Sequence, residues 1–210
     1  FVKIEKKIGE HSRAIFSGMI NKENAERYPY IGDDEIIEIY LGNEAVFVGY
    51  VEKIGVRHIA QDHYIDVTAV SLSVNMDIEK KIRTFQDKTM KYEDILNTIA
   101  TENGFKIIID KEIKGAIEFP IIQYMESDWE FMKRVVSRFK KEIVIDARNN
   151  AIYAGSSERG VRKVSNPVFK IEKDIKKYRD IVNNSDPKIT SENYVSYTLQ
   201  SREVFEAGDI

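Results

Sequence analysis

The spacing of apolar residues changes near Asn75, and this change is the strongest constraint on the fold. Before it, runs rich in Ile, Val, Tyr and Phe partly alternate with polar residues, as in 37–41 and 65–70. Such alternation is typical of strands with one buried face. After it, apolar residues first recur at helical spacing in 92–103. The sequence therefore predicts β-structure first and a mixed α/β region after it.

The first 75 residues contain four predicted strands. Leu41-Gly42-Asn43-Glu44 separates two of them and predicts a tight turn, since Gly and Asn tolerate positive φ. Short antiparallel strands with glycine-marked turns favour a small barrel or sandwich. The predicted strands are 13–20, 35–41, 45–54 and 64–74.

The next region predicts two helices on a small sheet. The first helix spans 92–103, with Gly104 as its C-terminal cap, and 106–110 follows as a buried strand. The second helix begins at Ser127-Asp128-Trp129-Glu130, a capping box in which the first and last side chains bond to each other's backbone N–H. A hairpin over 142–155 is predicted to turn at Asn149-Asn150 in type I′ geometry.

The polar stretch 156–165 indicates a boundary, after which 169–172, 194–199 and 202–206 are predicted strands. The predicted fold class is mixed β and α+β. It has three parts: a small antiparallel β-barrel at 1–75, an α/β insertion at 76–160, and the beginning of a second β-barrel at 161–210. The chain starts at Phe1 and stops at Ile210 as a strand is predicted to begin, so we expect a fragment of a longer protein.

Composition narrows the function classes. A net charge of −3 argues against a dedicated nucleic-acid binder. The absence of cysteine excludes disulfides and cysteine-ligated metal sites. No apolar run approaches the roughly 20 residues of a membrane-spanning helix. The chain also lacks the G-x-S-x-G, Walker A and G-x-G-x-x-G motifs of common hydrolases and nucleotide-binding folds.

The three histidines do not predict a metal site. His58 and His63 are five residues apart, whereas a zinc-binding helix places its histidines at i and i+4. We therefore interpret both as ordinary loop residues. His11 has no partner nearby in the sequence, which favours a surface or turn position.

The carboxylates give little sign of chemistry. Asp33-Asp34-Glu35 lacks the alternating oxygen ligands of a calcium loop and is interpreted as an exposed acidic turn. Glu126 and Asp128 could imitate a glycosidase pair, but Asp128 is explained by its place at the positive end of a helix.

Three further features have ordinary explanations. The basic stretch 170–179 is interleaved with acidic residues and predicts a solvated face rather than a single-strand binding surface. The sequon at Asn183 is a chance match, and Trp129 is predicted to pack in the core, with a subunit-contact role as the alternative. No catalytic, cofactor-binding or metal-binding residue is predicted.

Two blocks resemble one family. They are Arg83-Thr84-Phe85-Gln86-Asp87 and Gln123-Tyr124-Met125-Glu126-Ser127-Asp128-Trp129-Glu130-Phe131. They are similar to the tail-hub proteins of contractile phages, also called late-control protein D, and to the N-terminal half of VgrG spike proteins. Weaker similarity extends to Gly9-Glu10-His11-Ser12, to 46–51 and to 197–209.

The resemblance implies a structural protein rather than an enzyme. It implies two β-barrels separated by an α/β insertion, and a homotrimeric ring that joins the tail tube above to the membrane-piercing spike below. Assembly in the bacterial cytoplasm is expected, with no cofactor, no nucleic-acid binding and no stable membrane insertion. The alternatives are a peptidoglycan-degrading tail-associated enzyme and a β-barrel module that binds glycan or nucleic acid.

Overall fold

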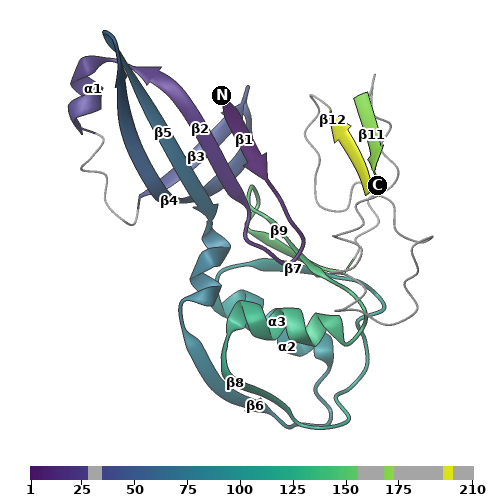
Figure 1. Cartoon of the computed structure of the whole chain (residues 1–210). Coiled ribbons are helices and arrows are strands. Elements are labelled where there is room, and N and C mark those ends of the chain that lie inside the picture. The colour runs from purple at the N-terminus through teal and green to yellow at the C-terminus, as the bar shows by residue number, and fades with distance from the viewer. Residues whose placement is uncertain (28–34, 156–167, 173–195, 201–210) are drawn as a thin grey trace. The chain divides into compact units, whose positions relative to one another are not determined.

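The computed structural model describes residues 1–27, 35–155, 168–172 and 196–200 (Figure 1). The chain divides into two compact units, one formed mainly by Phe1–Arg159 and the other by Gly160–Phe205. The first unit contains a β-sheet and an α/β region, and the fold is mixed β and α+β as the sequence predicts.

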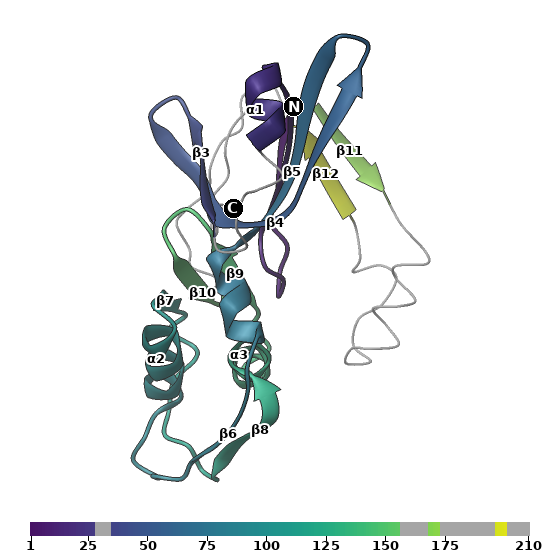
Figure 2. The same cartoon turned by 90° about the vertical axis from the view of Figure 1, so that its left-hand side faces the viewer.

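The sheet of the first unit has five antiparallel strands in the order β1-β2-β5-β4-β3 and curves into half a barrel (Figure 2). A short helix, α1 (Lys22–Arg27), packs against β5. The predicted strand 13–20 matches β2, whereas β4 is 16 residues long and continues well past the predicted end at 54. The strands are β1 (Val2–Glu5), β2 (Arg13–Ile20), β3 (Ile36–Leu41), β4 (Glu44–Ile59) and β5 (Asp62–Ser71).

Two glycines shape this sheet. Gly42 has a φ of 64° in the predicted two-residue turn, where Leu41 pairs with Glu44. At Gly49 the backbone of β5 approaches β4 closely, because a Cβ built there would be 2.2 Å from the carbonyl oxygen of Val70. A side chain at 49 would therefore force the two strands apart.

The α/β region follows a short 3₁₀ helix, η2 (Leu72–Asp77). It combines a three-stranded sheet of order β7-β10-β9, in which β7 and β10 are parallel, with a two-stranded ribbon of β6 and β8. Its elements are β6 (Lys80–Phe85), α2 (Tyr92–Glu102), β7 (Lys106–Ile109), β8 (Ile121–Ser127), α3 (Asp128–Ser137), β9 (Ile143–Asp146) and β10 (Ala151–Ala154).

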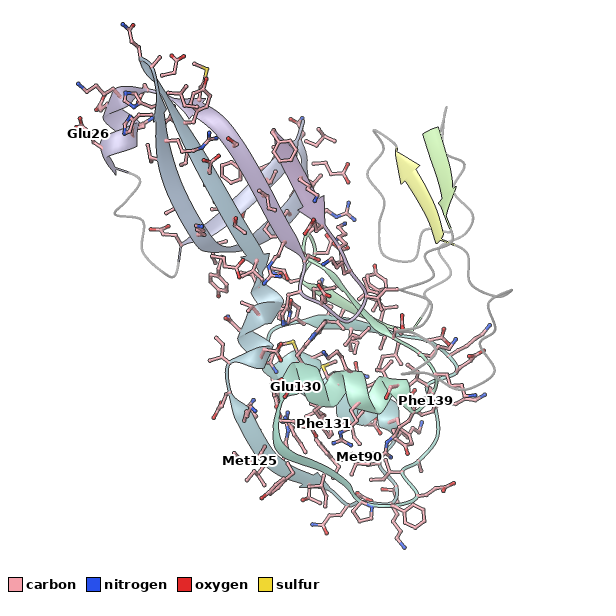
Figure 3. The ribbon with its side chains drawn as sticks, in the orientation of Figure 1. Glu26, Met90, Met125, Glu130, Phe131 and Phe139 are labelled. Carbon is pink, nitrogen blue, oxygen red and sulfur yellow. The ribbon has the colours of Figure 1, made fainter. Side chains whose placement is uncertain are left out.

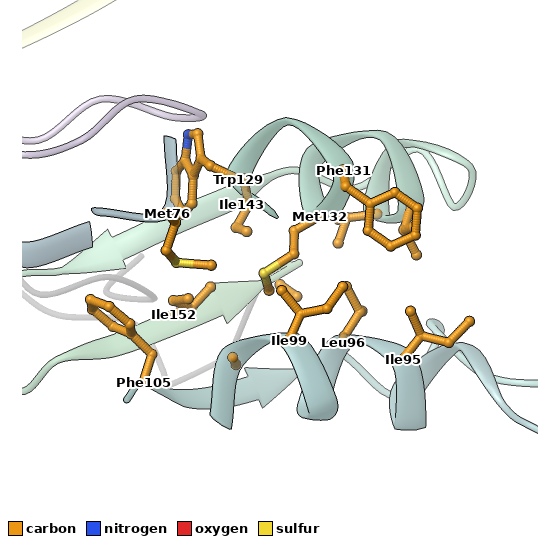
Figure 4. Packing of buried hydrophobic residues seen from close by; sticks show 14 of the residues in the cluster. Met76, Ile95, Leu96, Ile99, Phe105, Trp129, Phe131, Met132, Ile143 and Ile152 are labelled. Atoms are coloured by element: carbon orange, nitrogen blue, oxygen red, sulfur yellow. The ribbon is translucent and has the colours of Figure 1, made fainter. Parts of the chain in front are cut away.

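The main hydrophobic core lies between α2, α3 and the small sheet (Figure 4). From α2, Leu96 and Ile99 are fully buried, and they face Met132 of α3. Trp129, at the start of α3, is 1% exposed, as predicted for a core residue. Fully burying an aliphatic side chain such as that of Leu96 or Ile99 stabilises the fold by about 1.5–3 kcal/mol. The helical spacing of these residues therefore accounts for the packing of this region.

Two local predictions in this region are wrong. β7 is not a buried strand: it pairs on one side only, with β10, and Ile108 is 39% exposed. The hairpin of β9 and β10 does not have a type I′ turn. Its connection has four residues, 147–150, and of the two asparagines only Asn150 has a positive φ, of 48°. A type I′ turn needs positive φ at both central residues.

In the second unit, β11 (Val168–Glu172) pairs antiparallel with β12 (Ser196–Gln200). These strands correspond to the predicted 169–172 and 194–199. The predicted boundary at 156–165 and the predicted strand 202–206 lie outside the described residues.

Candidate functional site: a polar junction at the start of α3

The second family-like block forms the N-terminus of α3, where the predicted capping box is confirmed. The backbone N–H of Glu130 donates to Ser127 Oγ at 3.1 Å, and the N–H of Ser127 donates to Glu130 Oε2 at 3.0 Å. Figure 3 labels Glu130 at this end of the helix. The Ser127 hydroxyl donates in turn to Asp77 of η2. The cap thus also joins α3 to the segment that follows the half-barrel.

Asp128 is the centre of a buried polar cluster and is 1% exposed. Its Oδ2 accepts from Lys81 Nζ at 2.7 Å and from Asn103 Nδ2 at 2.8 Å. Its Oδ1 accepts from Gln123 Nε2 at 3.0 Å and from the guanidinium of Arg83. Charge-assisted bonds of this kind are the strong ones in a protein interior. The helix-dipole explanation of Asp128 is therefore incomplete, since β6, β8 and Asn103, the C-cap of α2, all supply partners.

The two family-like blocks meet in this cluster. Arg83 of the first block donates from Nε to Gln123 Oε1 of the second block at 2.5 Å. It also donates to Glu102 at the end of α2, at 2.6 Å. Each block therefore completes the hydrogen bonding of the other, which gives a physical reason for finding both in one chain.

The surroundings of Asp128 lower its pKa. Burial by itself raises the pKa, but the hydrogen bonds from Lys81, Asn103 and Gln123 and the charge of Arg83 outweigh it. The carboxylate is therefore held in its ionised form. A group fixed in that state serves as an anchor rather than as an acid catalyst.

A β-bulge helps to aim the side chains of β8. The pairing of β6 with β8 shifts between Lys81 and Ile82, which leaves Met125 as the extra residue, with a φ of 50°. Met125, which Figure 3 labels, is 53% exposed, whereas Gln123 on the same strand is fully buried. Bulges commonly redirect side chains in this way.

Glu126 does not form a glycosidase pair with Asp128. Arg134 of α3 donates to Glu126 from Nε at 3.1 Å and from Nη2. Both carboxylates are thus engaged by cations. The lowered pKa of Asp128 also opposes its use as the protonated acid of a glycosidase pair.

His11 is the second centre of this polar region. It lies in the β1–β2 connection, next to the turn at 8–10, which agrees with the turn position that the sequence allowed, but its side chain is only 14% exposed. Its Nε2 lies 2.9 Å from Asp77 Oδ2, and its Nδ1 lies 2.8 Å from Ser73 Oγ. Ser73 Oγ is 2.8 Å from Ser71 Oγ, which accepts from the backbone N–H of Ser12 at 3.1 Å.

Ser73, His11 and Asp77 have the composition of a nucleophilic triad, but Ser73 is 0% exposed. A nucleophile must reach a substrate carbonyl. The arrangement therefore acts as an internal brace between the β1–β2 connection and η2.

Direct contacts join the half-barrel to the α/β region on both sides of this brace. Trp129 Nε1 donates to the carbonyl of Gly9 at 3.2 Å, and the indole lies 4.8 Å from the His11 ring. Gly9 N–H donates to Ile143 of β9 at 2.8 Å. We call these contacts, together with the clusters around Asp128 and His11, the polar junction. The polar junction holds the half-barrel against the α/β region.

His58 and His63 are not loop residues. They lie on β4 and β5, directly opposite each other, with ring centroids 4.4 Å apart. The sequence gives little sign of this because Ala60 and Gln61 form the turn, and Ala60 has a φ of 56° that few alanines adopt. The fold thus brings these two imidazoles together, whereas His11 lies elsewhere, in the β1–β2 connection.

Several predicted features fall elsewhere. Asp33, Asp34, Asn183 and most of 170–179 lie outside the described residues, and Glu35 is exposed. Within the described part of the chain, no group of three or more His, Asp or Glu side chains could hold a metal ion. Among the same residues, no helix has the length and apolar character needed to cross a membrane.

Sequence reasoning missed the partners of Asp128 and the role of Asp77. Lys81 and Arg83 alternate with Ile82 on β6, which indicates a two-faced strand, but nothing local shows what either cation binds. The one available signal was their position in or beside the two family-like blocks.

No protein-family model matches the chain, and no curated protein matches its sequence. Among solved structures it is similar to the 43 kDa tail protein of prophage MuSo2 from Shewanella oneidensis, with a TM-score of 0.56 and 14% identity over 80% of this chain and 58% of that one. It is also similar to a tail protein from Neisseria meningitidis, with a TM-score of 0.59 and 12% identity over 82% and 54% of the two chains.

A third similar structure is an Escherichia coli component of the type VI secretion system, described as structurally similar to the bacteriophage T4 tail proteins gp27 and gp5. Its TM-score is 0.50 with 13% identity over 84% of this chain and 56% of that one. The chain spans a little over half the length of these three proteins. It has a fold that phage tail proteins and a type VI secretion component share.

Proposed function

We propose that this protein is a structural subunit of a phage tail or a related injection particle, and that it forms a homotrimeric hub between the tail tube and the spike. The carrying observation is the similarity of its fold to two tail proteins and one secretion component over at least 80% of the chain. A second support is that Arg83, Gln123 and Asp128, from the two hub-like blocks, bind one another.

The proposal includes the predicted division into a first barrel at 1–75, an α/β insertion at 76–160 and the start of a second barrel at 161–210. The half-barrel supports contact with a second copy of the chain. Within the described residues its edge strands, β1 and β3, each have one partner strand. An open groove of about 470 Å³ is lined by residues of both edges. Unprotected edges favour pairing with another chain.

The exposed apolar side chains at these edges fit the same proposal. Val2 is 57% exposed, Ile36 51%, Tyr40 55% and Leu41 61%. Burying them against a neighbouring copy gains about 25 cal/mol per Å² of apolar surface. In a particle that transmits force, the polar junction would keep the half-barrel and the α/β region from shearing apart. In this role the protein would catalyse no reaction, bind no nucleic acid and insert stably into no membrane. It would be assembled into the particle in the bacterial cytoplasm.

The proposal is tested by measuring the molar mass of the protein in solution, by light scattering over a range of concentrations. The protein is expressed with any residues that its gene encodes on either side of this chain. We expect a trimer. Ile36→Lys with Tyr40→Lys should shift it to monomer, because the lysines desolvate poorly at an edge contact. Ile82→Lys, at an exposed apolar site on the β6–β8 ribbon, is the matched control and should leave the trimer intact.

Two results would contradict the proposal. A monomer at the highest concentration reached would exclude the trimeric hub. Release of sugar from purified peptidoglycan would point instead to the tail-associated hydrolase.

A further inference from the structure

The turn end of the β4–β5 hairpin holds two imidazoles face to edge. His58 and His63 have ring planes at 87° and centroids 4.4 Å apart, and their Nδ1 atoms are in direct contact. His58 is exposed and His63 is half-buried. Both rings can therefore be reached from solvent.

The pairing of the strands fixes this arrangement. His58 pairs with His63, and residues directly opposite in an antiparallel pair project from the same face of the sheet. The flanking pairs, Arg57 with Tyr64 and Ile59 with Asp62, project from the other face. The histidines are thus set side by side by the backbone before any ligand arrives, which reduces the entropy lost on binding.

We propose that His58 and His63 form a binding site for a borderline divalent metal ion such as Zn²⁺ or Ni²⁺, held by the two Nδ1 atoms. Imidazole nitrogen suits these ions, whereas Mg²⁺ and Ca²⁺ prefer oxygen ligands. Two nitrogens on a tetrahedral zinc ion, each at about 2.0–2.1 Å, are about 3.3 Å apart. The two Nδ1 atoms face each other at closer range, so the rings must move apart to admit the ion.

Water completes the coordination. Within the described residues no third His, Asp or Glu joins the pair. A site with two protein ligands and open positions binds less tightly than a closed four-ligand site and exchanges its ion readily. The bound ion would cross-link β4 and β5 at the end of the hairpin. This site does not depend on the proposed hub function.

The test is a titration of the whole protein with ZnCl₂ and, separately, NiCl₂, followed by calorimetry and by the NMR signals of the histidine rings. We expect one ion per chain, and with Zn²⁺ the signals of His58 and His63 should shift while that of His11 stays in place. His58→Gln and His63→Gln should each weaken binding about tenfold or more, which is about 1.4 kcal/mol. Asp62→Asn, on the opposite face, is the matched control and should bind as the unmodified protein does.

The proposal is overturned if neither ion binds at millimolar concentration, or if His58→Gln binds as tightly as the unmodified protein. Equal binding of CaCl₂ would also overturn it, because that would place the ion on oxygen ligands. Circular dichroism of each variant checks that the exposed substitutions leave the fold unchanged.

Discussion

The half-barrel and the α/β region differ most in what each one buries. The α/β region, together with Met76 of η2, holds a cluster of 18 buried apolar residues, including three aromatics and two methionines. The cluster on the half-barrel has four, of which Phe47 alone is large and one, Ala147, comes from the α/β region. One region therefore packs against itself, and the other depends on what lies against it.

The small residues of the half-barrel explain this dependence. Ala14 and Ala69 leave room for the β9–β10 turn, which reaches the sheet with Ala147. Val48 N–H donates to the carbonyl of Ala147 at 3.1 Å, and Arg148 Nη1 donates to Glu44 at 2.7 Å. A barrel closed on itself would fill its interior with larger side chains. The α/β region thus fills part of the core that the open sheet lacks.

The largest effect is expected from a cavity in the α/β core. Leu96→Ala removes a side chain that is 0% exposed, and it should lower the free energy of unfolding by about 3–5 kcal/mol. The matched control, Ile82→Ala, removes a side chain that is 64% exposed and should cost less than about 0.5 kcal/mol. Urea unfolding measures both. Equal losses would mean that the α/β region has no dominant core.

The next effect tests the half-barrel itself. Gly49→Ala places a Cβ where it meets Val70 O at 2.2 Å and the Phe47 ring at 2.8 Å, so β4 and β5 must separate. We expect a loss of about 3 kcal/mol. At Gly18, on β2, a Cβ would meet nothing within 4 Å, and Gly18→Ala should be nearly neutral. Hydrogen exchange should show the damage from Gly49→Ala in the half-barrel before the α/β core, and uniform damage would contradict the division into two regions.

The sequence predicts elements whose pattern is local. The strand 13–20 and the helix from Tyr92 agree with the structure because each carries its own periodicity and its own boundary signal, such as Gly104 with a φ of 77°. The capping box at Ser127 is local too, since its two partners are three residues apart.

What the sequence could not predict depends on pairing between distant segments. Ile108 is exposed because it lies on the face of the edge strand β7 opposite to Ile107 and Ile109, which pack against the core, and this depends on how β7 is placed in the fold. His58 and His63 face each other only because the chain turns at Ala60, and alanine is not a residue type from which a turn is predicted. The partners of Asp128 come from three separate elements, so no spacing rule could bring them together.

A smaller effect is expected from the polar junction. Asp128→Asn keeps the shape but removes the charge that binds Lys81 and Arg83, and it should cost about 2 kcal/mol at neutral pH. Because the folded protein lowers the pKa of Asp128, its stabilising contribution is complete above the unfolded value near 4 and is lost as pH falls through the lower folded value. The difference in stability between the two proteins should therefore shrink in acid. Urea unfolding between pH 7 and pH 3 checks this, and a constant difference would show that charge is not the cause.

The smallest effect is expected on the outer face of the half-barrel, where Asp66 pairs with Arg57. The hydrogen bond from Arg57, followed by that from Ser17, lowers the pKa of Asp66 to about 2. Since the folded pKa is the lower one, the pair adds stability above the ordinary value near 4 and loses it as pH falls toward about 2. Both side chains are well exposed, at 53% and 39%, so water screens the pair and stability should change little on Arg57→Ala.

The pKa of Asp66 itself should nevertheless respond strongly to Arg57→Ala. Between about pH 5 and pH 3 the carboxyl NMR signal of Asp66 should stay constant in the unmodified protein and should titrate in the variant, near the ordinary value. Arg13→Ala, which breaks the exposed pair with Glu52 on the same sheet, is the control and should leave the Asp66 signal unchanged. An Asp66 signal that titrates alike in all three proteins would mean that Arg57 does not hold the carboxylate. A large loss of stability would contradict the contrast with Asp128, because an exposed pair would then hold the sheet as firmly as the buried cluster holds α3.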